Sequence, residues 1–179
     1  MLVIGIDPGT ATTGYGLVRE DEKGNLEAVA HGVVTTPSNW EMPQRLLAIY
    51  EELKEIIQEH QPDSGAVEKL FFQSNVRTAI SVGQGRGAAL IALAASAIPS
   101  GEYTPLEIKQ AVVGYGNADK NQVQQMVKML LNLEEIPRPD DAADALAVAI
   151  CHIHSTGRDR LTEIAKTYTP PSVLQLSRP

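Results

Sequence analysis

The sequence is poor in cysteine and lacks long apolar runs. Its single cysteine, Cys151, cannot form an internal disulfide. No apolar run approaches the ~20 residues needed to span a bilayer, and the opening Met-Leu-Val-Ile lacks the basic stretch and cleavage site of a secretory signal. We therefore expect a cytoplasmic protein that does not contact membranes, with Cys151 a buried, reduced thiol.

Basic residues are also scarce. Lysine and arginine number 15 against 22 aspartates and glutamates, which gives a net charge of −7. Because phosphate contacts need lysine and arginine, this balance argues against a general nucleic-acid binder. An acidic excess can coexist with a basic groove, and a site built from carboxylates adds negative charge of its own. Composition therefore leaves the partner open.

The apolar pattern predicts one domain of alternating strands and helices. A chain of 179 residues with 43% hydrophobic content can bury about two-thirds of its unfolded surface, enough for one core. Strands are expected at 2–7, 14–19, 26–35, 65–68 and near 102–103, and helices at 43–60, 75–98, 106–113, from 119, and from about 140 to 154. This order favours an α/β fold, a mixed sheet with helices on both faces. Residues 156–179 contain three prolines and little periodicity, so they are expected to form a loose tail.

The segment 75–98 is rich in small residues, including Gly83, Gly85 and Gly87. Small side chains let another backbone approach closely. The segment therefore predicts a helix–helix contact or a dimer surface.

Four acidic residues occupy unusual places. Asp7 and Glu68 each close an apolar strand, and Asp141 and Asp144 lie three apart at a helix start, on one helix face. Asp7 alone would be typical of a turn or cap. Glu68 is followed by apolar residues, and an isolated buried carboxylate needs a proton, a cation or a metal.

Asp140 has a simpler explanation. It lies between Pro139 and the helical run, which is typical of an N-cap. His152 and His154 are excluded from a shared site, because His152 lies eight residues beyond Asp144, about 12 Å along the helix.

Carboxylates without cysteine or histidine at zinc spacing indicate a hard cation, Mg²⁺ or Mn²⁺. Two such ions about 4 Å apart can activate a water and stabilise the leaving oxygen in phosphodiester hydrolysis.

Four segments together resemble the RuvC crossover junction endodeoxyribonucleases. They are GIDPGTATTGYG (5–16), VEKLFF (67–72), VVGYGNADKNQV (112–123) and DAADALAVAICH (141–152). The resemblance covers about the first 155 residues. It implies a ribonuclease-H-like fold of about five strands over 1–155, a homodimer, a RuvA–RuvB partner, and paired nicks on opposite strands of a four-way DNA junction in recombination and repair.

The resemblance also implies residue roles. Asp7, Glu68, Asp141 and Asp144 match the family's metal-binding catalytic carboxylates, although some members have histidine at the position of Asp141. Two Mg²⁺ ions per site are implied, with Mn²⁺ as a substitute. Lys120 matches a lysine near the scissile phosphate, where a cation can offset charge in the transition state.

DNA contacts are expected from four further positions. Lys109 matches a basic position of the family, and Phe71 matches an aromatic that contacts bases near the junction centre. Arg77 and Arg86, in the following helix, could hold phosphates as Lys109 and Lys120 would, but ordinary surface exposure explains these two arginines equally well.

Three alternatives remain at this point. The chain could be a YqgF-like ribonuclease-H-like nuclease that acts on RNA, or a catalytically silent junction-binding protein. Asp7-Pro8-Gly9-Thr10 also resembles the phosphate turn of actin-like and sugar kinases, but 179 residues are too few for their two lobes. The acidic pI of about 5.1 departs from many RuvC members and puts junction affinity in question.

Overall fold

One mixed sheet forms the centre of the molecule. The computed structural model describes residues 1–69 and 76–167, with side chains described in 1–69 and 79–157. Five strands lie in this part: β1 (Leu2–Asp7), β2 (Thr12–Glu20), β3 (Leu26–Thr35), β4 (Ser64–Glu68) and β5 (Ser100–Tyr103). Their order is β3-β2-β1-β4-β5, antiparallel from β3 to β1 and parallel from β1 to β5.

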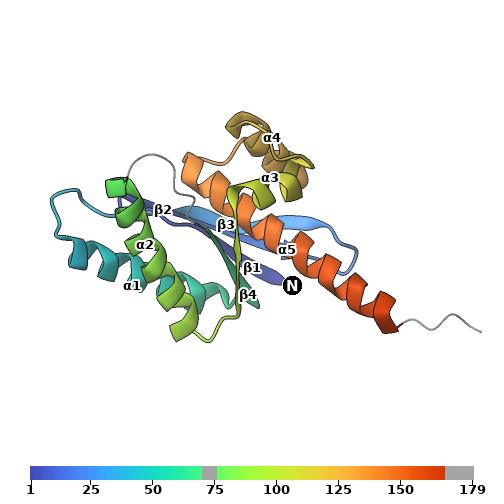
Figure 1. Cartoon of the computed structure of the whole chain (residues 1–179), viewed down its shortest axis with the longest axis horizontal. Helices are drawn as coiled ribbons and strands as arrows, with labels where there is room; N and C mark the ends of the chain where they lie inside the picture. Colours follow the sequence, from blue (N-terminus) through green and yellow to red (C-terminus); the bar gives the residue numbers. More distant parts are fainter. Residues whose placement is uncertain (70–75, 168–179) are drawn as a thin grey trace, which may run out of the picture.

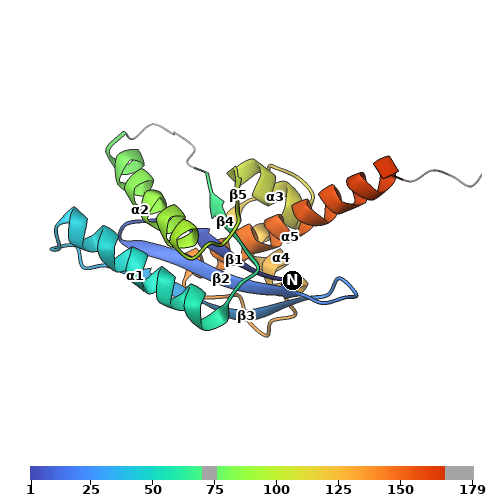
Figure 2. The same ribbon diagram turned by 90° about the horizontal axis from the view of Figure 1, so that it is seen from below.

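Helices cover both faces of this sheet, as the sequence predicted. α1 (Met42–His60) and α2 (Val76–Ala95) lie on one face. α3 (Pro105–Val113), α4 (Lys120–Leu130) and α5 (Asp140–Thr167) lie on the other, as Figures 1 and 2 show. Thr104 and Asp119 cap α3 and α4 in capping boxes, which sets where both helices begin.

Strand alternation divides the buried residues into two cores. Ile4, Ile6 and Leu17 pack under α1 and α2. Val3 and Val18 pack under α5, together with Ala66 of β4. On the sheet, isoleucine and leucine side chains face α1 and α2, whereas the smaller valine and alanine side chains face α5.

Glycines bring α5 into direct contact with the sheet. A Cβ on Gly5 would overlap the Ala145 carbonyl oxygen, and one on Gly16 would lie 2.8 Å from the Leu146 backbone nitrogen. Isolated glycines within strands often mark such close approaches. The helix backbone therefore rests on the strand backbone with no side chain between them.

The last helix is longer than the sequence predicted. It was expected to end near residue 154 and to be followed by a loose tail from 156, but α5 continues to Thr167. No proline interrupts it before Pro170. The added turns extend past the sheet in Figures 1 and 2, which explains why apolar periodicity did not reveal them. Residues 168–179 of the predicted tail lie outside the described part.

The side chain of Cys151 is buried, as expected. Among the helices of the described residues, none is long and apolar enough to cross a membrane.

Candidate active site

Asp7 and Glu68 lie at the ends of neighbouring strands. β1 and β4 run parallel, with Ile6 opposite Val67, so the next residues leave the sheet at the same edge. Side chains alternate between faces, and Gly5 and Ala66 face α5. Asp7 and Glu68, two residues further on, therefore point to the α5 face as well.

The start of α5 lies over the same edge. Asp7 is opposite Gly14 in the β1–β2 ladder, and a Cβ on Gly14 would overlap the Asp141 carbonyl oxygen. This close contact places Asp141, and Asp144 one turn later, above Asp7. The structure thus brings together the four carboxylates that the sequence singled out.

Burial raises the pKa of three of these carboxylates, those of Asp7, Glu68 and Asp144. Loss of solvation, followed by the charges of Glu68 and Asp144, raises the pKa of Asp7 from 3.8 to about 8. Loss of solvation also raises the pKa of Glu68, which shares a hydrogen bond with Asp7. At neutral pH Asp7 therefore keeps its proton, and its O–H donates a hydrogen bond to the Glu68 carboxylate.

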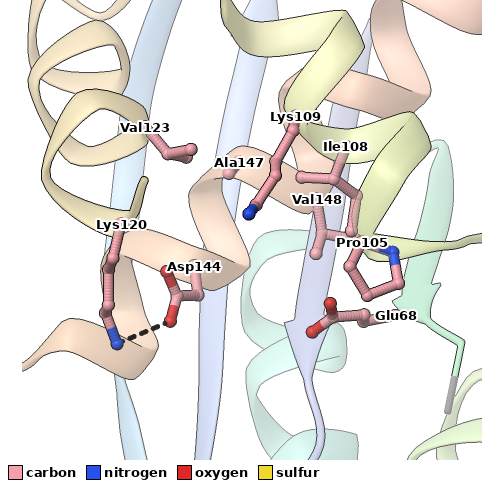
Figure 3. Close-up of a pocket in the computed structure, with 9 residues that line it drawn as sticks. All are labelled: Glu68, Pro105, Ile108, Lys109, Lys120, Val123, Asp144, Ala147 and Val148. Carbon is pink, nitrogen blue, oxygen red and sulfur yellow. Dashed lines mark ion pairs between the residues drawn. The ribbon is translucent and has the colours of Figure 1, made fainter. Parts of the chain in front are cut away.

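Asp144 has a partly compensated charge. Loss of solvation raises its pKa, while Lys120 acts in the opposite direction. The Lys120 Nζ lies 3.1 Å from Asp144 Oδ2, as Figure 3 shows by a dashed line. The same Nζ lies 3.3 Å from Asp140 Oδ2. Lys120 is the first residue of α4, so the Asp119 cap determines its position.

Asp140 does not take the capping role that was predicted for it. It is the first residue of α5, and the Pro139 carbonyl accepts a hydrogen bond from the Ala142 N–H at 3.0 Å. The carboxylate of Asp140 instead pairs with Lys120 and with Arg138, at 3.3 Å each. Local sequence could not show the Lys120 contact, because that residue lies in another helix.

A cavity of about 200 Å³ opens beside the carboxylates. Glu68 and Asp144 lie on its wall with Lys109 and Lys120, and Figure 3 shows the Lys109 amine pointing into it. The remaining wall is largely apolar, formed by side chains of α3, α4 and α5. The cavity therefore joins acidic oxygens and two cations in one small space.

The donor chemistry fits a divalent cation. The cluster holds carboxylates that are short of solvent and have raised pKa values, and a cation would neutralise them. As they stand, no three ligand-type side chains among the described residues converge on one point, and Lys120 lies against Asp144. Binding of an ion would thus require small side-chain rotations.

The other predicted site residues fall into two groups. Arg86 lies on α2, where its guanidinium pairs with Glu102 and Nε donates to the Glu68 carbonyl oxygen at 3.3 Å. Phe71 and the side chain of Arg77 lie outside the described residues. His152 and His154, which the sequence excluded from the site, have partners elsewhere: His152 contacts Tyr103 and Ser64, and His154 contacts the Ala111 carbonyl.

Two features were missed by sequence reasoning. One is the Asp140–Lys120 pair, for which the sequence carries no signal. The other is the set Gly5, Gly14 and Gly16, whose spacing within strands was a usable sign of close backbone contact.

Known proteins match this chain over most of its length. The family model for "Crossover junction endodeoxyribonuclease RuvC" matches residues 3–152. A protein of that name from Syntrophomonas wolfei is 58% identical over 155 residues, 87% of this chain and 90% of the relative. Another from Rubrobacter xylanophilus is 53% identical over 165 residues, 92% of each chain.

Solved structures agree with this match. Thermus thermophilus RuvC is 35% identical with a TM-score of 0.83, over 89% of this chain and 97% of the other. T. thermophilus RuvC in complex with a Holliday junction substrate is 32% identical with a TM-score of 0.81, over 88% and 96%.

The five-stranded mixed sheet has the ribonuclease-H-like fold, and the matched family places the chain in the class of metal-dependent nucleases. Similarity to named relatives identifies the family within this class of nucleases. The chain belongs to the RuvC family of crossover junction endodeoxyribonucleases.

Proposed function

We propose that this chain resolves four-way DNA junctions by metal-dependent hydrolysis of phosphodiester bonds, paired on opposite strands, in recombination and repair. The observation that carries the proposal is the meeting of four carboxylates from two strand ends and one helix start, beside a cavity with two lysines. The relative solved with a Holliday junction substrate supports the choice of DNA substrate.

Asp7, Glu68, Asp141 and Asp144 would hold the metal, which we take to be two Mg²⁺ ions with Mn²⁺ as a substitute. When bound, the metal supplies an activated water and a Lewis acid for the phosphate. Asp7 would have to lose its proton to hold the cation, because a metal-binding carboxylate must be ionised. Nuclease activity should therefore increase with pH as Asp7 becomes easier to ionise.

The two lysines would act on the phosphate. Lys120 pairs with Asp144, and its amine would be available for the phosphate at the reacting bond when that carboxylate holds a cation instead. Lys109 points into the cavity with no salt bridge among those of the described residues, a suitable place for a backbone phosphate. Phe71 stays a proposed DNA contact on the family resemblance, and Arg77 stays one because it is a basic residue in the helix that follows.

Dimerisation is the remaining part of the proposal. On α2, Ile80 and Ile91 are 59% and 61% exposed and lie eleven residues, or three turns, apart on one face. Gly87 lies between them with open space where a Cβ would be. This uncharged stripe offers a surface for a second copy of the chain, which would place two active sites on one junction.

The nuclease domain is proposed to span residues 1–155, with residues beyond it dispensable for cleavage. A cytoplasmic location and a RuvA–RuvB partner complete the proposal, and both rest on the family.

The first experiment compares a mobile four-way junction with a linear duplex of the same sequence. Both are incubated with Mg²⁺ or EDTA, with the natural chain or Asp7→Asn. Symmetric nicks in the junction alone, dependent on Mg²⁺ and absent in the variant, are expected. An RNA hairpin serves as a third substrate, since cleavage there with an intact junction would favour a YqgF-like activity, and binding without any cleavage would indicate a silent protein.

A further inference from the structure

Arg86 lies on the reverse side of the sheet from the carboxylate cluster. Strand alternation turns Gly101 and Tyr103 of β5 toward His152 on α5, which leaves Glu102 facing α2. There the Arg86 guanidinium meets the Glu102 carboxylate. The Arg86 side chain is 20% exposed and that of Glu102 is 40% exposed, so this pair is partly shielded from solvent.

The same guanidinium also holds the end of β4. Its Nε donates a hydrogen bond to the backbone carbonyl of Glu68 at 3.3 Å. One residue further on, the Lys69 N–H donates to the Tyr103 carbonyl at 2.7 Å, which ties β4 to β5 at the same level. Arg86 therefore links α2 to the two strands at the point where the Glu68 side chain enters the site.

α2 contacts the Asp7 side of the site as well. Ser81 and Thr10 share a hydrogen bond at 2.6 Å, and a Cβ on Gly85 would lie 3.1 Å from the Gly9 carbonyl oxygen. Gly85 is the residue before Arg86, so its close approach sets the depth at which the guanidinium meets β4. One helix thus supports both strand ends that carry Asp7 and Glu68.

We propose that Arg86 is a positioning residue, paired with Glu102, that holds the end of β4 and so orients the Glu68 carboxylate for metal binding. This differs from the phosphate contact expected from sequence, because the guanidinium is engaged by protein groups on the face away from the cavity. Groups that orient a metal ligand typically change metal affinity or activity by about 10–100-fold when they are removed. The inference rests on the proposed function, in which Glu68 binds metal.

The variants Arg86→Gln, Arg86→Lys and Glu102→Gln test the proposal. Arg19→Gln is the matched control, because Arg19 is exposed and lies opposite Leu2, at the other end of β1 from Asp7. Mn²⁺ affinity is measured by calorimetry without DNA. Junction binding is measured in Ca²⁺ at several salt concentrations, and cleavage is measured at saturating junction across a Mg²⁺ titration. Thermal melting checks that each variant folds.

A positioning role predicts weaker Mn²⁺ binding and a higher Mg²⁺ requirement, by about 10-fold in Arg86→Gln, with junction affinity within twofold. Arg86→Lys should not restore the metal affinity, because a point charge on a flexible stem does not reproduce the fixed geometry in which the planar guanidinium meets Glu102 and the Glu68 carbonyl. Glu102→Gln should move the same quantities in the same direction. If Arg86→Gln does not fold, the other two variants still decide.

If Arg86 instead contacts a DNA phosphate, the opposite pattern is expected, and that pattern would overturn the proposal. Arg86→Gln would then weaken junction binding and reduce its salt slope by about one, Arg86→Lys would largely restore binding, and Glu102→Gln would leave it equal or stronger. Unchanged Mn²⁺ affinity in both Arg86→Gln and Glu102→Gln would overturn it as well. If the natural chain binds Mn²⁺ but cuts no junction, the proposed function fails while the Mn²⁺ titrations still judge Arg86.

Discussion

The two faces of the sheet solve different packing problems. Toward α1 and α2 the sheet presents Ile4, Ile6 and Leu17, large side chains that fill the space between layers. Toward α5 it presents Gly5, Gly14 and Gly16, together with Ala66 of β4, so that the helix backbone touches the strands. Only the second face carries the carboxylates.

This difference shows what close packing contributes to the site. A helix held one side chain away from the sheet would place Asp141 and Asp144 several ångströms farther from Asp7 and Glu68. Large aliphatic side chains bury more apolar surface than glycine. The sheet face toward α5 therefore has less hydrophobic stabilisation but a shorter distance between the helix and the strands. The α1/α2 face supplies the larger share of apolar burial on the sheet itself.

The largest expected effect comes from the carboxylates on the α5 face. Asp7→Asn, Glu68→Gln or Asp144→Asn should each lower the junction-cleavage rate by about 10²–10⁴-fold, because a metal ligand contributes several kcal/mol to the transition state. Junction binding in Ca²⁺ should be largely retained. Full activity in any one variant would remove that residue from the mechanism.

Disrupting the close contact between the α5 backbone and β1 should have the next largest effect. Gly5→Ala places a methyl group against the Ala145 carbonyl oxygen and pushes α5 away from the sheet. Unfolding free energy should fall by about 1–3 kcal/mol, and cleavage should fall by roughly 10–100-fold as the carboxylates separate.

Gly157→Ala is the control for this test. It lies in the same helix, but open space surrounds its Cβ position. It should keep activity and gain roughly 0.5–1 kcal/mol of stability by chemical denaturation. Equal behaviour of the two variants would show that helix–sheet distance does not control the site.

The outer surface of the α1/α2 face should control assembly. Ile91→Asp puts a charge into the exposed stripe on α2, and the dissociation constant of the dimer should rise at least about tenfold, or about 1.4 kcal/mol. Sedimentation velocity measures it. Met129→Asp, which alters an even more exposed side chain on α4 (71% exposed), is the control and should leave the dimer intact.

A smaller effect is expected in the pH dependence of metal-free stability. The pKa of Asp7 is raised from 3.8 to about 8 on folding, so the folded state holds the extra proton. The contribution of this proton to the free energy of unfolding is complete below about pH 4 and is lost as pH rises through about 8. Asp7→Asn should flatten this decline and add roughly 0.5–2 kcal/mol near pH 8.

Denaturant titrations at pH 4, 6 and 8 in EDTA measure this effect. Saturating Mg²⁺ should remove the decline in the natural chain but not alter the variant. A decline of equal slope in the variant would assign it to other groups.

Much of the fold and the identity of the acidic residues follow from local patterns in the sequence. Strand alternation and helical periodicity predicted each strand and most helix starts, since burial of one face leaves its period in the residues. The acidic residues stood out because charged side chains ended apolar strands and entered an apolar helix. The motifs at Asp7, Glu68 and Asp141–Asp144 indicated the family.

Contacts between distant segments depended on the tertiary structure. The pairing of Lys120 with Asp140, and the engagement of Arg86 by Glu102 and the Glu68 carbonyl, join residues that no local pattern connects. The length of α5 was also hidden, because a helix that extends past the core needs no apolar face. Sequence by itself determined which residues are chemically unusual, whereas only folding decided their neighbours, because the distances and solvation that set a side chain's charge and role arise from packing.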